Sequence, residues 1–442
     1  MHQEPHHESL PAATGTYKEP STFSESNPQA SRVPPERIAH PFDFLALALA
    51  SGTSYFTYWI IQLGLALFAI RITRSPVLVS GIAFALTVPW LVCGLFAGAL
   101  VDRYNRQHVL LVSTTLRLVI LGSAACVAAL GYVSLPLLYA IALALGITQT
   151  LENPALSAAV PMVVAEAKLE KANAWLSGTQ NFVELLASPL GGLVASIGAA
   201  LTLGIGAGCT LAGLVALHFL RGTRTVFRSH LAKKRHIVSE ALDGIRFMWH
   251  QQTLGVIGLM AAVINACWGA YSGILVLYVV APGPVELAAS GYGVLLMSIG
   301  IGGVIGTFLT LPVQRWLGRR WAIGLNIAGN ALMFVAPALS TNGWIIGCAA
   351  FLGGIGGPMW TIAAAALQGR IVPTDLQGRV NAAYRFLGIG SAAIGPILGG
   401  VCAQLFGLRI VFAACACLTI FMLIPFWRVI TEDVMRYTRE AE

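Results

Sequence analysis

Long apolar runs separated by short polar breaks make up the chain from residue 42 onward. Uncharged stretches such as 118–151 and 247–285 exceed the roughly 20 residues that a helix needs to cross a bilayer. The pattern therefore predicts membrane-spanning helices in two groups of six. The first group is expected at 43–70, 78–101, 108–130, 135–155, 173–197 and 200–220, and the second at 254–281, 289–312, 321–340, 344–366, 380–405 and 409–429.

Three hydrophilic segments flank these groups and divide the chain into an N-terminal bundle at 42–220 and a C-terminal bundle at 254–429. Residues 1–41 are rich in Pro, Ser, Glu and His, which predicts a disordered cytoplasmic tail. Residues 430–442 form a second expected cytoplasmic tail. Segment 221–253 begins with clustered basic residues and continues with apolar residues at helical spacing. It is either a basic amphipathic helix on the cytoplasmic membrane surface or a simple tether.

Composition agrees with an integral membrane protein. Apolar residues are 56% of the chain and charged residues 10%, against about 25% charged residues in soluble domains. The net charge of +8 is therefore no sign of nucleic-acid binding. Of the 27 Lys and Arg residues, three lie in one set of loops (Arg71, Arg74, Arg409), two lie within spans (Arg117, Arg385), and the others lie in the tails and opposite loops. This asymmetry predicts an inner or plasma membrane protein with both termini in the cytoplasm.

The two halves repeat in sequence. Pairs of matching residues are separated by the same 208 positions: Gly94 and Gly98 match Gly302 and Gly306, Asn173-Ala174 matches Asn381-Ala382, and Gly191-Gly192 matches Gly399-Gly400. A shared register over such distances predicts two parallel six-helix repeats. In transporters built this way, the substrate site lies near the bilayer midplane between the repeats.

A charged loop between the second and third spans resembles the signature loop of the major facilitator superfamily. Gly98, Asp102, Arg103 and Arg106 fill the places of that motif, whereas Asn105 and Gln107 depart from its usual glycine and basic residue. The resemblance implies the all-α major facilitator fold with twelve transmembrane helices.

Further stretches are similar to one branch of that superfamily. Asn153-Pro-Ala155, Val163-Val164 and Ala172-Asn-Ala174 resemble the cytoplasmic ends of spans four and five in the drug:proton antiporter branch, with its macrolide-efflux and enterobactin-exporter proteins. Segment 372–380 repeats this pattern in the second half. The likeness covers roughly residues 42–425 and is specific for the branch, much less so for the cargo.

Glu184 is the acidic residue expected deepest in a span. It lies about twelve residues into span five, or roughly 18 Å at 1.5 Å per residue, near the bilayer middle. Charge there is costly, and a side chain that binds and releases a proton is what proton-driven transport requires. A fixed ion pair and a neutral hydrogen-bonded role remain alternatives. Arg117 has the right depth to be its proton-coupling partner, although the third span is peripheral in this superfamily and packing is a second role for Arg117.

The resemblance also implies a cytoplasmic gate formed by Gly98, Asp102, Arg103, Arg106, Glu152 and Arg379. In the facilitator plan Glu152 engages Arg106 or Arg103, and Asp102 caps the helix that begins near Arg379. Such contacts hold the halves together and break on inward opening; a static surface ion pair is the alternative.

The substrate cavity is expected where spans one, four, seven and ten face one another in this family. The candidate lining residues are Tyr55, Tyr58, Trp59 and Gln62 in span one, Asn265, Trp268 and Tyr271 in span seven, and Trp360 in span ten. Aromatic side chains with a few amides suit a bulky, partly apolar cargo. Arg385 either extends to the cytoplasmic surface or places positive charge at the cavity mouth. The branch commonly has Asp where Tyr58 aligns, so any proton coupling depends more heavily on Glu184.

No catalytic constellation, nucleotide-binding glycine-Lys loop or His cluster within the spans is found, so we expect no enzyme activity, no cofactor and no metal. The sequence predicts a secondary active transporter, monomeric in the lipid bilayer, that exports a drug-like small molecule or siderophore against protons. Proton-independent facilitated uptake, lipid flipping and a non-transporting membrane sensor remain alternatives.

Overall fold

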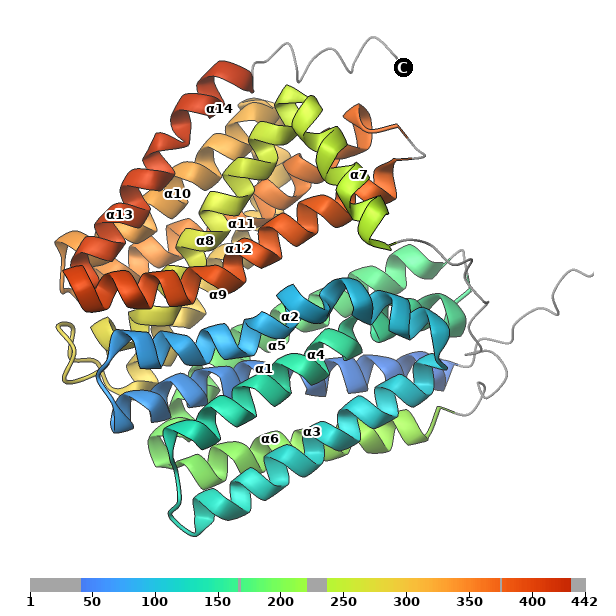
Figure 1. Ribbon diagram of the computed structural model, residues 1–442, viewed down its shortest axis with the longest axis vertical. Helices are drawn as coiled ribbons and strands as arrows, with labels where there is room; N and C mark the ends of the chain where they lie inside the picture. The colour runs from blue at the N-terminus through green and yellow to red at the C-terminus, as the bar shows by residue number, and fades with distance from the viewer. Residues whose placement is uncertain (1–40, 166–167, 221–236, 374–375, 431–442) are drawn as a thin grey trace, which may run out of the picture. The chain divides into compact units, whose positions relative to one another are not determined.

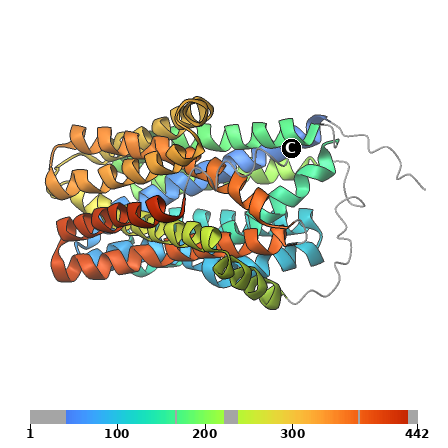
Figure 2. The ribbon, with the colours of Figure 1, turned by 90° about the horizontal axis from the view of Figure 1, so that it is seen from above.

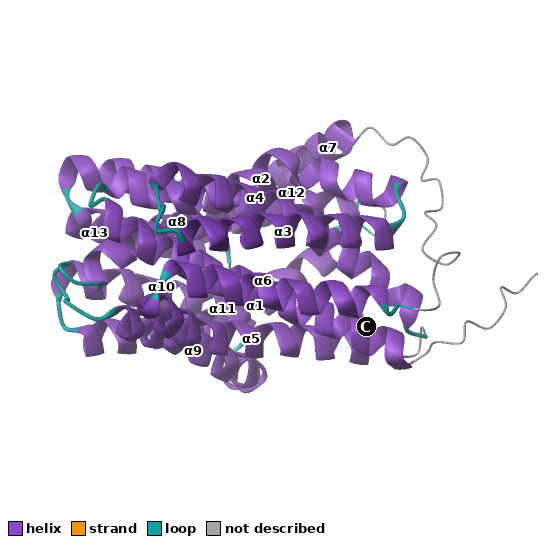
Figure 3. Cartoon of the chain, turned by 90° about the horizontal axis from the view of Figure 1, so that it is seen from below, coloured by secondary structure: helices purple, strands orange, loops and turns teal. Residues whose placement is uncertain are grey.

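The computed structural model describes residues 41–165, 168–220, 237–373 and 376–430. These residues form helices joined by short connections (Figure 3), and one isolated β-bridge between Val280 and Leu287 is the only strand-like pairing among them. The predicted N-terminal tail up to residue 40, the basic start of the linker and residues 431–442 lie outside the described residues.

Each of the twelve predicted spans is helical, the first eleven as one helix each and the last as two, in two groups that Figure 1 colours blue to green and yellow to red. The first group comprises α1 (Pro41–Ile72), α2 (Pro76–Arg103), α3 (Arg106–Ala129), α4 (Leu135–Val163), α5 (Leu169–Ile197) and α6 (Ala199–His218). The second comprises α8 (Gln252–Val279), α9 (Ala289–Trp316), α10 (Arg319–Leu339), α11 (Gly343–Ile371), α12 (Gln377–Phe406), α13 (Leu408–Phe421) and α14 (Leu423–Val429). The last predicted span, 409–429, is thus broken between α13 and α14.

Several helices are longer than predicted at one end. The α4 helix continues to Val163 instead of ending at residue 155, although it contains Pro154 and Pro161. Its 29 residues correspond to about 44 Å, more than the roughly 30 Å of hydrocarbon. Proline is tolerated inside membrane helices because neighbouring helices satisfy the freed backbone groups, so the helix continues past both prolines.

The α5 helix differs from the others in composition. Eleven described helices are long and apolar enough to cross a membrane by length and composition, with α13 and α14 taken together as one span. The α5 helix is not among them, because Asn173, Gln180, Asn181 and Glu184 dilute its apolar residues. With α5, whose 29 residues suffice in length, the described helices account for the twelve spans that the sequence predicts.

The two halves contact each other closely at one end, here called the far end, where α1 ends and α2 begins. Gly192 of α5 lies on Ala289 and Gly293 of α9, and a Cβ at Gly192 would be 2.6 Å from the Ala289 carbonyl oxygen. The equivalent helices of the repeat meet in the same way, since Gly400 of α12 lies on Ser80 of α2. The repeat predicted from sequence is therefore visible as a symmetric pair of glycine contacts.

Hydrogen bonds reinforce the far end. The Arg74 guanidinium donates to the Ala281 carbonyl oxygen at 3.0 Å, and the Ser75 hydroxyl donates to Gln404 Oε1 at 3.0 Å. The opposite end, where α1 begins, α6 ends and α8 begins, is called the linker end.

Helix α7 (Ile237–His250) lies at the linker end and packs against α12 and α8 (Figures 1 and 2). Gly244 leaves no room for a Cβ because it rests on the Arg379 carbonyl group. Met248 is buried in a small cluster with Leu254, Val372 and Val380. The second half of the chain, rather than lipid, therefore covers the apolar side chain of Met248.

Candidate functional site

Two cavities lie between the halves toward the linker end. The first, about 570 Å³, is lined by the α1, α2, α4, α5 and α12 helices, and the second, about 690 Å³, mainly by α8, α10, α11 and α12. Trp90, Asn381, Arg385 and Ile389 line both. The two cavities therefore adjoin at α2 and α12.

Amide side chains supply much of the polar lining. They are Asn153, Asn173 and Gln180 in the first cavity, Asn265, Asn326, Asn330 and Gln368 in the second, and Asn381 in both. Among the described lining residues, Arg385 is the only charged one. The combination suits a bound molecule that makes several hydrogen bonds.

Most of the predicted cavity residues line these spaces. Tyr55 lines the first cavity, Asn265, Trp268 and Trp360 line the second, and Arg385 lines both. Trp360 Nε1 also donates a hydrogen bond of 2.9 Å to the hydroxyl of Tyr384, which fixes the indole ring of Trp360.

Tyr58 is the predicted cavity residue that lines neither of these cavities nor the third one described next. It packs edge-on against Trp59, with ring centroids 5.9 Å apart, and lies against the buried core. Tyr58 lies three residues after Tyr55 and four before Gln62, on the same face of α1, but its ring packs against the core instead of lining one of these cavities.

Glu184 lines a third, smaller cavity of about 140 Å³ that lies closer to the far end. Trp59, Gln62, Trp268 and Tyr271, four predicted cavity residues, share its wall with Glu184. The structure thus brings together residues that are far apart in the sequence, from α1, α5 and α8.

Polar atoms in this third cavity lack partners. Gln62 Oε1 and the Tyr271 hydroxyl are buried and have no hydrogen-bond partner among the described residues. Glu184 forms no ion pair with a described residue, and its backbone carbonyl accepts a hydrogen bond of 3.2 Å from Ser188. A cavity of this size has room for several waters at about 30 Å³ each, and Glu184, Gln62 and Tyr271 offer them polar partners within a mainly apolar wall.

Trp268 and Ile299 lie between the second and third cavities, since both residues line both cavities. The Trp268 ring stacks on Tyr271 at 5.8 Å between centroids and 26° between planes. Tyr271 is fully buried and in turn packs against Phe334 and Phe412. A tryptophan held in this way is a partition between the larger spaces and the cavity of Glu184.

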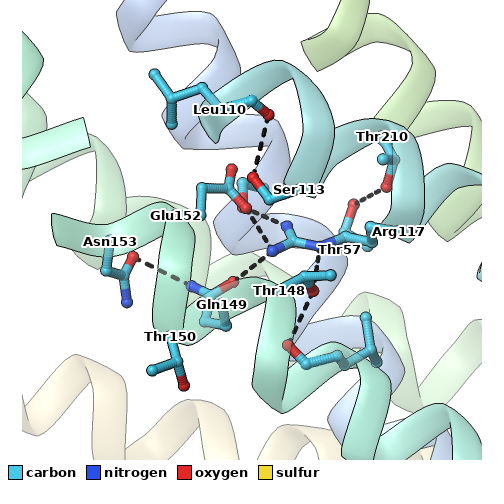
Figure 4. Close-up of polar contacts among 12 residues, drawn as sticks. Thr57, Leu110, Ser113, Arg117, Thr148, Gln149, Thr150, Glu152, Asn153 and Thr210 are labelled. Carbon is cyan, nitrogen blue, oxygen red and sulfur yellow. Dashed lines mark hydrogen bonds and ion pairs between the residues drawn. The ribbon is translucent and has the colours of Figure 1, made fainter. Parts of the chain in front are cut away.

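Arg117 belongs to a buried polar cluster in the first half (Figure 4). Its guanidinium forms an ion pair with Glu152 of α4 and donates hydrogen bonds to Ser54, Thr148 (3.2 Å) and Gln149 (3.0 Å). The side chains of Arg117 and Glu152 are only 1% and 2% exposed. Gln149 also donates to Asn153 at 3.3 Å, so the cluster reaches the wall of the first cavity.

This cluster corrects two pairings expected from sequence. The ion pair of Glu152 is with Arg117, not with Arg106 or Arg103, because α3 and α4 pack side by side and bring Arg117 level with Glu152. Arg117 consequently does not pair with Glu184. Packing within the first half, the alternative role considered for Arg117, matches its position.

The other expected gate residues lie near the linker end. Arg106 Nη1 contacts Met162 Sδ of α4 at 3.8 Å, and the Arg379 carbonyl group packs against Gly244 of α7. Gly98, Asp102 and Arg103 belong to the last turns of α2, where their side chains are outside the described part of the chain. Their role in a gate stays a prediction.

Several lining residues were not among the sequence candidates, notably Trp90, Gln180, Tyr292 and the amides Asn173 and Asn381. The repeated Asn-Ala pair was a usable signal, because equivalent positions of two repeats face the same central space. Trp90 and Tyr292 had no comparable signal.

The family described as transmembrane secretion effectors, within the major facilitator superfamily, matches residues 39–435. The multidrug efflux pump Tap of Mycolicibacterium fortuitum is 26% identical over 348 residues, which cover 75% of this chain and 82% of that protein. The enterobactin exporter EntS of Shigella boydii serotype 4 (strain Sb227) is 26% identical over 373 residues, which cover 83% of this chain and 86% of that protein.

Solved structures share the architecture at much lower identity. The nucleoside transporter NupG superposes with a TM-score of 0.70 at 12% identity, covering 88% of this chain and 99% of that one. A bacterial homologue of the iron transporter ferroportin, in an inward-facing state, gives 0.68 at 15% identity, covering 87% and 97%. These likenesses show the fold.

Proposed function

Because the chain belongs to the transmembrane secretion effector family of the major facilitator superfamily, we propose that it exports a drug-like or siderophore-like small molecule by proton-coupled alternating access. In this proposal the first and second cavities hold the cargo, and Glu184 in the third cavity binds and releases the coupling proton.

The direction and the cargo class are supported by the relatives. Their names describe a multidrug efflux pump and an enterobactin exporter, both of which move small molecules outward. Cavities of about 570 and 690 Å³ lie in the range of roughly 300–1,000 Å³ typical of sites for drug-sized molecules. Aromatic and amide side chains in their walls suit a bulky cargo with hydrogen-bonding groups.

The position of Glu184 is the observation that carries proton coupling. The other acid deep in the first half, Glu152, forms an ion pair with Arg117. Glu184 lines a cavity between the halves without an ion-pair partner among the described residues. An ionisable side chain inside a membrane protein that faces a water-filled cavity is typical of proton pathways.

Alternating access is supported by the difference between the two ends. Backbone contacts at Gly192 and Gly400 bring the halves together at the far end, whereas the larger cavities lie toward the linker end. The excess of basic residues in the linker-end loops favours the cytoplasmic side for that end. The conformation then accepts cargo from the cytoplasm, and separation of α5 from α9 and of α2 from α12 releases it outside.

Gradient-driven transport in inverted membrane vesicles tests the proposal. We expect wild-type vesicles to accumulate a cargo compound when acidified inside, and Glu184→Gln to abolish this accumulation. Glu286→Gln, which removes an exposed acid from the far-end loop, is the matched control and should transport normally. Undiminished gradient-driven accumulation by Glu184→Gln contradicts proton coupling through Glu184. Movement of the compound by the wild type that does not respond to the proton gradient favours proton-independent uptake or lipid flipping. If the wild type moves no compound under any gradient, a sensor role gains support.

A further inference from the structure

Arg385 lies where a positive charge has an energetic cost. It is in the third turn of α12, eight residues after Gln377 and therefore roughly 12 Å along the helix axis. A guanidinium at such a depth needs water or a counter-charge. Its side chain is exposed, and the space next to it is formed by the first and second cavities, both of which it lines.

The described residues provide no counter-charge for Arg385. Its guanidinium forms no hydrogen bond or ion pair with any described residue. It also does not lie over the ring of any described aromatic residue. No acidic residue of the described chain lines the first or second cavity. Glu152 is paired with Arg117, and Glu184 lines the third cavity.

The surroundings of Arg385 suit an anionic group attached to an apolar body. Arginine presents five N–H donors in a planar fork that fits the two oxygens of a carboxylate or of a similar oxyanion. Asn381, one turn earlier on α12, lines the same two cavities and adds an amide. Trp90 and Trp360 supply aromatic surface in the second cavity.

We propose that the cargo is an amphipathic anion whose acidic group binds Arg385 while its aromatic or apolar body packs in the second cavity. This inference rests on the proposed export function and adds the charge of the cargo. A cationic compound would place a like charge beside an unpaired guanidinium, with no carboxylate in either cavity to compensate. The cavities therefore select against cations.

A matched set of three fluorescent probes tests this selectivity: dansylglycine carries a carboxylate, dansylamide is neutral and dansylcadaverine carries an ammonium. Energy transfer from tryptophan to the dansyl group reports binding to the purified full chain without any gradient, because Trp90, Trp268 and Trp360 line the second cavity. We expect wild-type protein to bind dansylglycine at least about tenfold more tightly than dansylcadaverine.

Variants assign the preference to Arg385. We expect Arg385→Gln to weaken dansylglycine binding by about 10- to 100-fold, the loss typical of charge-assisted hydrogen bonds, and to leave dansylamide binding within about twofold. Arg385→Lys keeps the charge without the fork and should retain part of the affinity. Arg428→Gln, which removes an exposed charge from α14 outside the three cavities, should bind like the wild type.

Binding and transport together separate this inference from the export function. Tighter binding of dansylcadaverine, unchanged dansylglycine binding in Arg385→Gln, or no measurable dansylglycine binding by the wild type overturns the inference. Gradient-driven transport of dansylcadaverine that is insensitive to Arg385→Gln also overturns it and leaves the export function standing. An Arg385-dependent preference for dansylglycine without gradient-driven transport supports the inference and counts against the export function.

Discussion

Replacement of Glu152 with Gln should destabilise the protein far more than replacement of Glu184 with Gln. Arg117 and Glu152 form an ion pair that is almost fully buried. Removal of one partner from such a pair costs about 3–5 kcal/mol, because the remaining charge has no compensation. The hydrogen bonds from Arg117 to Ser54, Thr148 and Gln149 persist in the variant but do not neutralise the guanidinium.

Glu184 provides the matched comparison because it has no ion-pair partner among the described residues. Its conversion to Gln removes a charge from a poorly solvated place and leaves no other charge unpaired, so the free energy of unfolding should fall by no more than about 1 kcal/mol or should rise. The double variant Arg117→Leu/Glu152→Leu should be more stable than Glu152→Gln, since it leaves neither charge behind.

Reversible unfolding in mixed micelles, followed by circular dichroism as the mole fraction of dodecyl sulfate rises, gives the free energy of unfolding of each variant. A loss of 3–5 kcal/mol corresponds to roughly a 100- to 4,000-fold change in the unfolding equilibrium, well above the error of the method. Equal losses for Glu152→Gln and Glu184→Gln would refute the conclusion that Glu152 is held in an ion pair while Glu184 is free of one. So would a double variant no more stable than Glu152→Gln.

Two further predictions concern the far end and the partition. Gly192→Leu should push α5 away from α9, because a Cβ there meets the Ala289 carbonyl oxygen at 2.6 Å. The reporter is a thiol label applied from outside to Ser188→Cys, in a chain whose eight native cysteines are replaced. Labelling in Gly192→Leu should be severalfold higher than in the control Gly204→Leu, where no atom lies within 4 Å of the added Cβ. Unchanged labelling contradicts the far-end seal. Trp268→Ala should join the second and third cavities and produce a proton leak without cargo, measured with a pH dye inside liposomes, whereas a proton-tight variant contradicts the partition role.

The helical architecture was predictable because lipid imposes a simple rule on the sequence. Each span needs a long apolar run, and the runs of this chain are separated by recognisable turns. The constant offset between repeats also carried three-dimensional information. Gly192 and Gly400, matched in sequence, occupy equivalent contacts between the halves. The α5 helix was predicted from the breaks on either side of its apolar run, although its amides make it less apolar than the other helices.

The pairing inside the site was less predictable, because depth along a helix does not specify which neighbour a side chain meets. Arg117 and Glu184 have similar depth by residue count, yet α3 packs against α4 and α6, not against the third cavity. Glu152 was assigned to the signature loop by resemblance, and its actual partner depends on the rotation of α3. Asn173 and Asn381 were found as a repeat, but their place in the cavity walls required the packing of α5 and α12.

The central claim is that cargo movement is coupled to protons through Glu184, and the most direct measurement is the pH inside liposomes during cargo efflux without an imposed proton gradient. As dansylglycine leaves wild-type liposomes down its own gradient, the account predicts that the lumen acidifies. Liposomes with Glu184→Gln should release dansylglycine at constant luminal pH. Luminal acidification of the same extent per molecule released by Glu184→Gln, or no acidification in the wild type, would contradict the account.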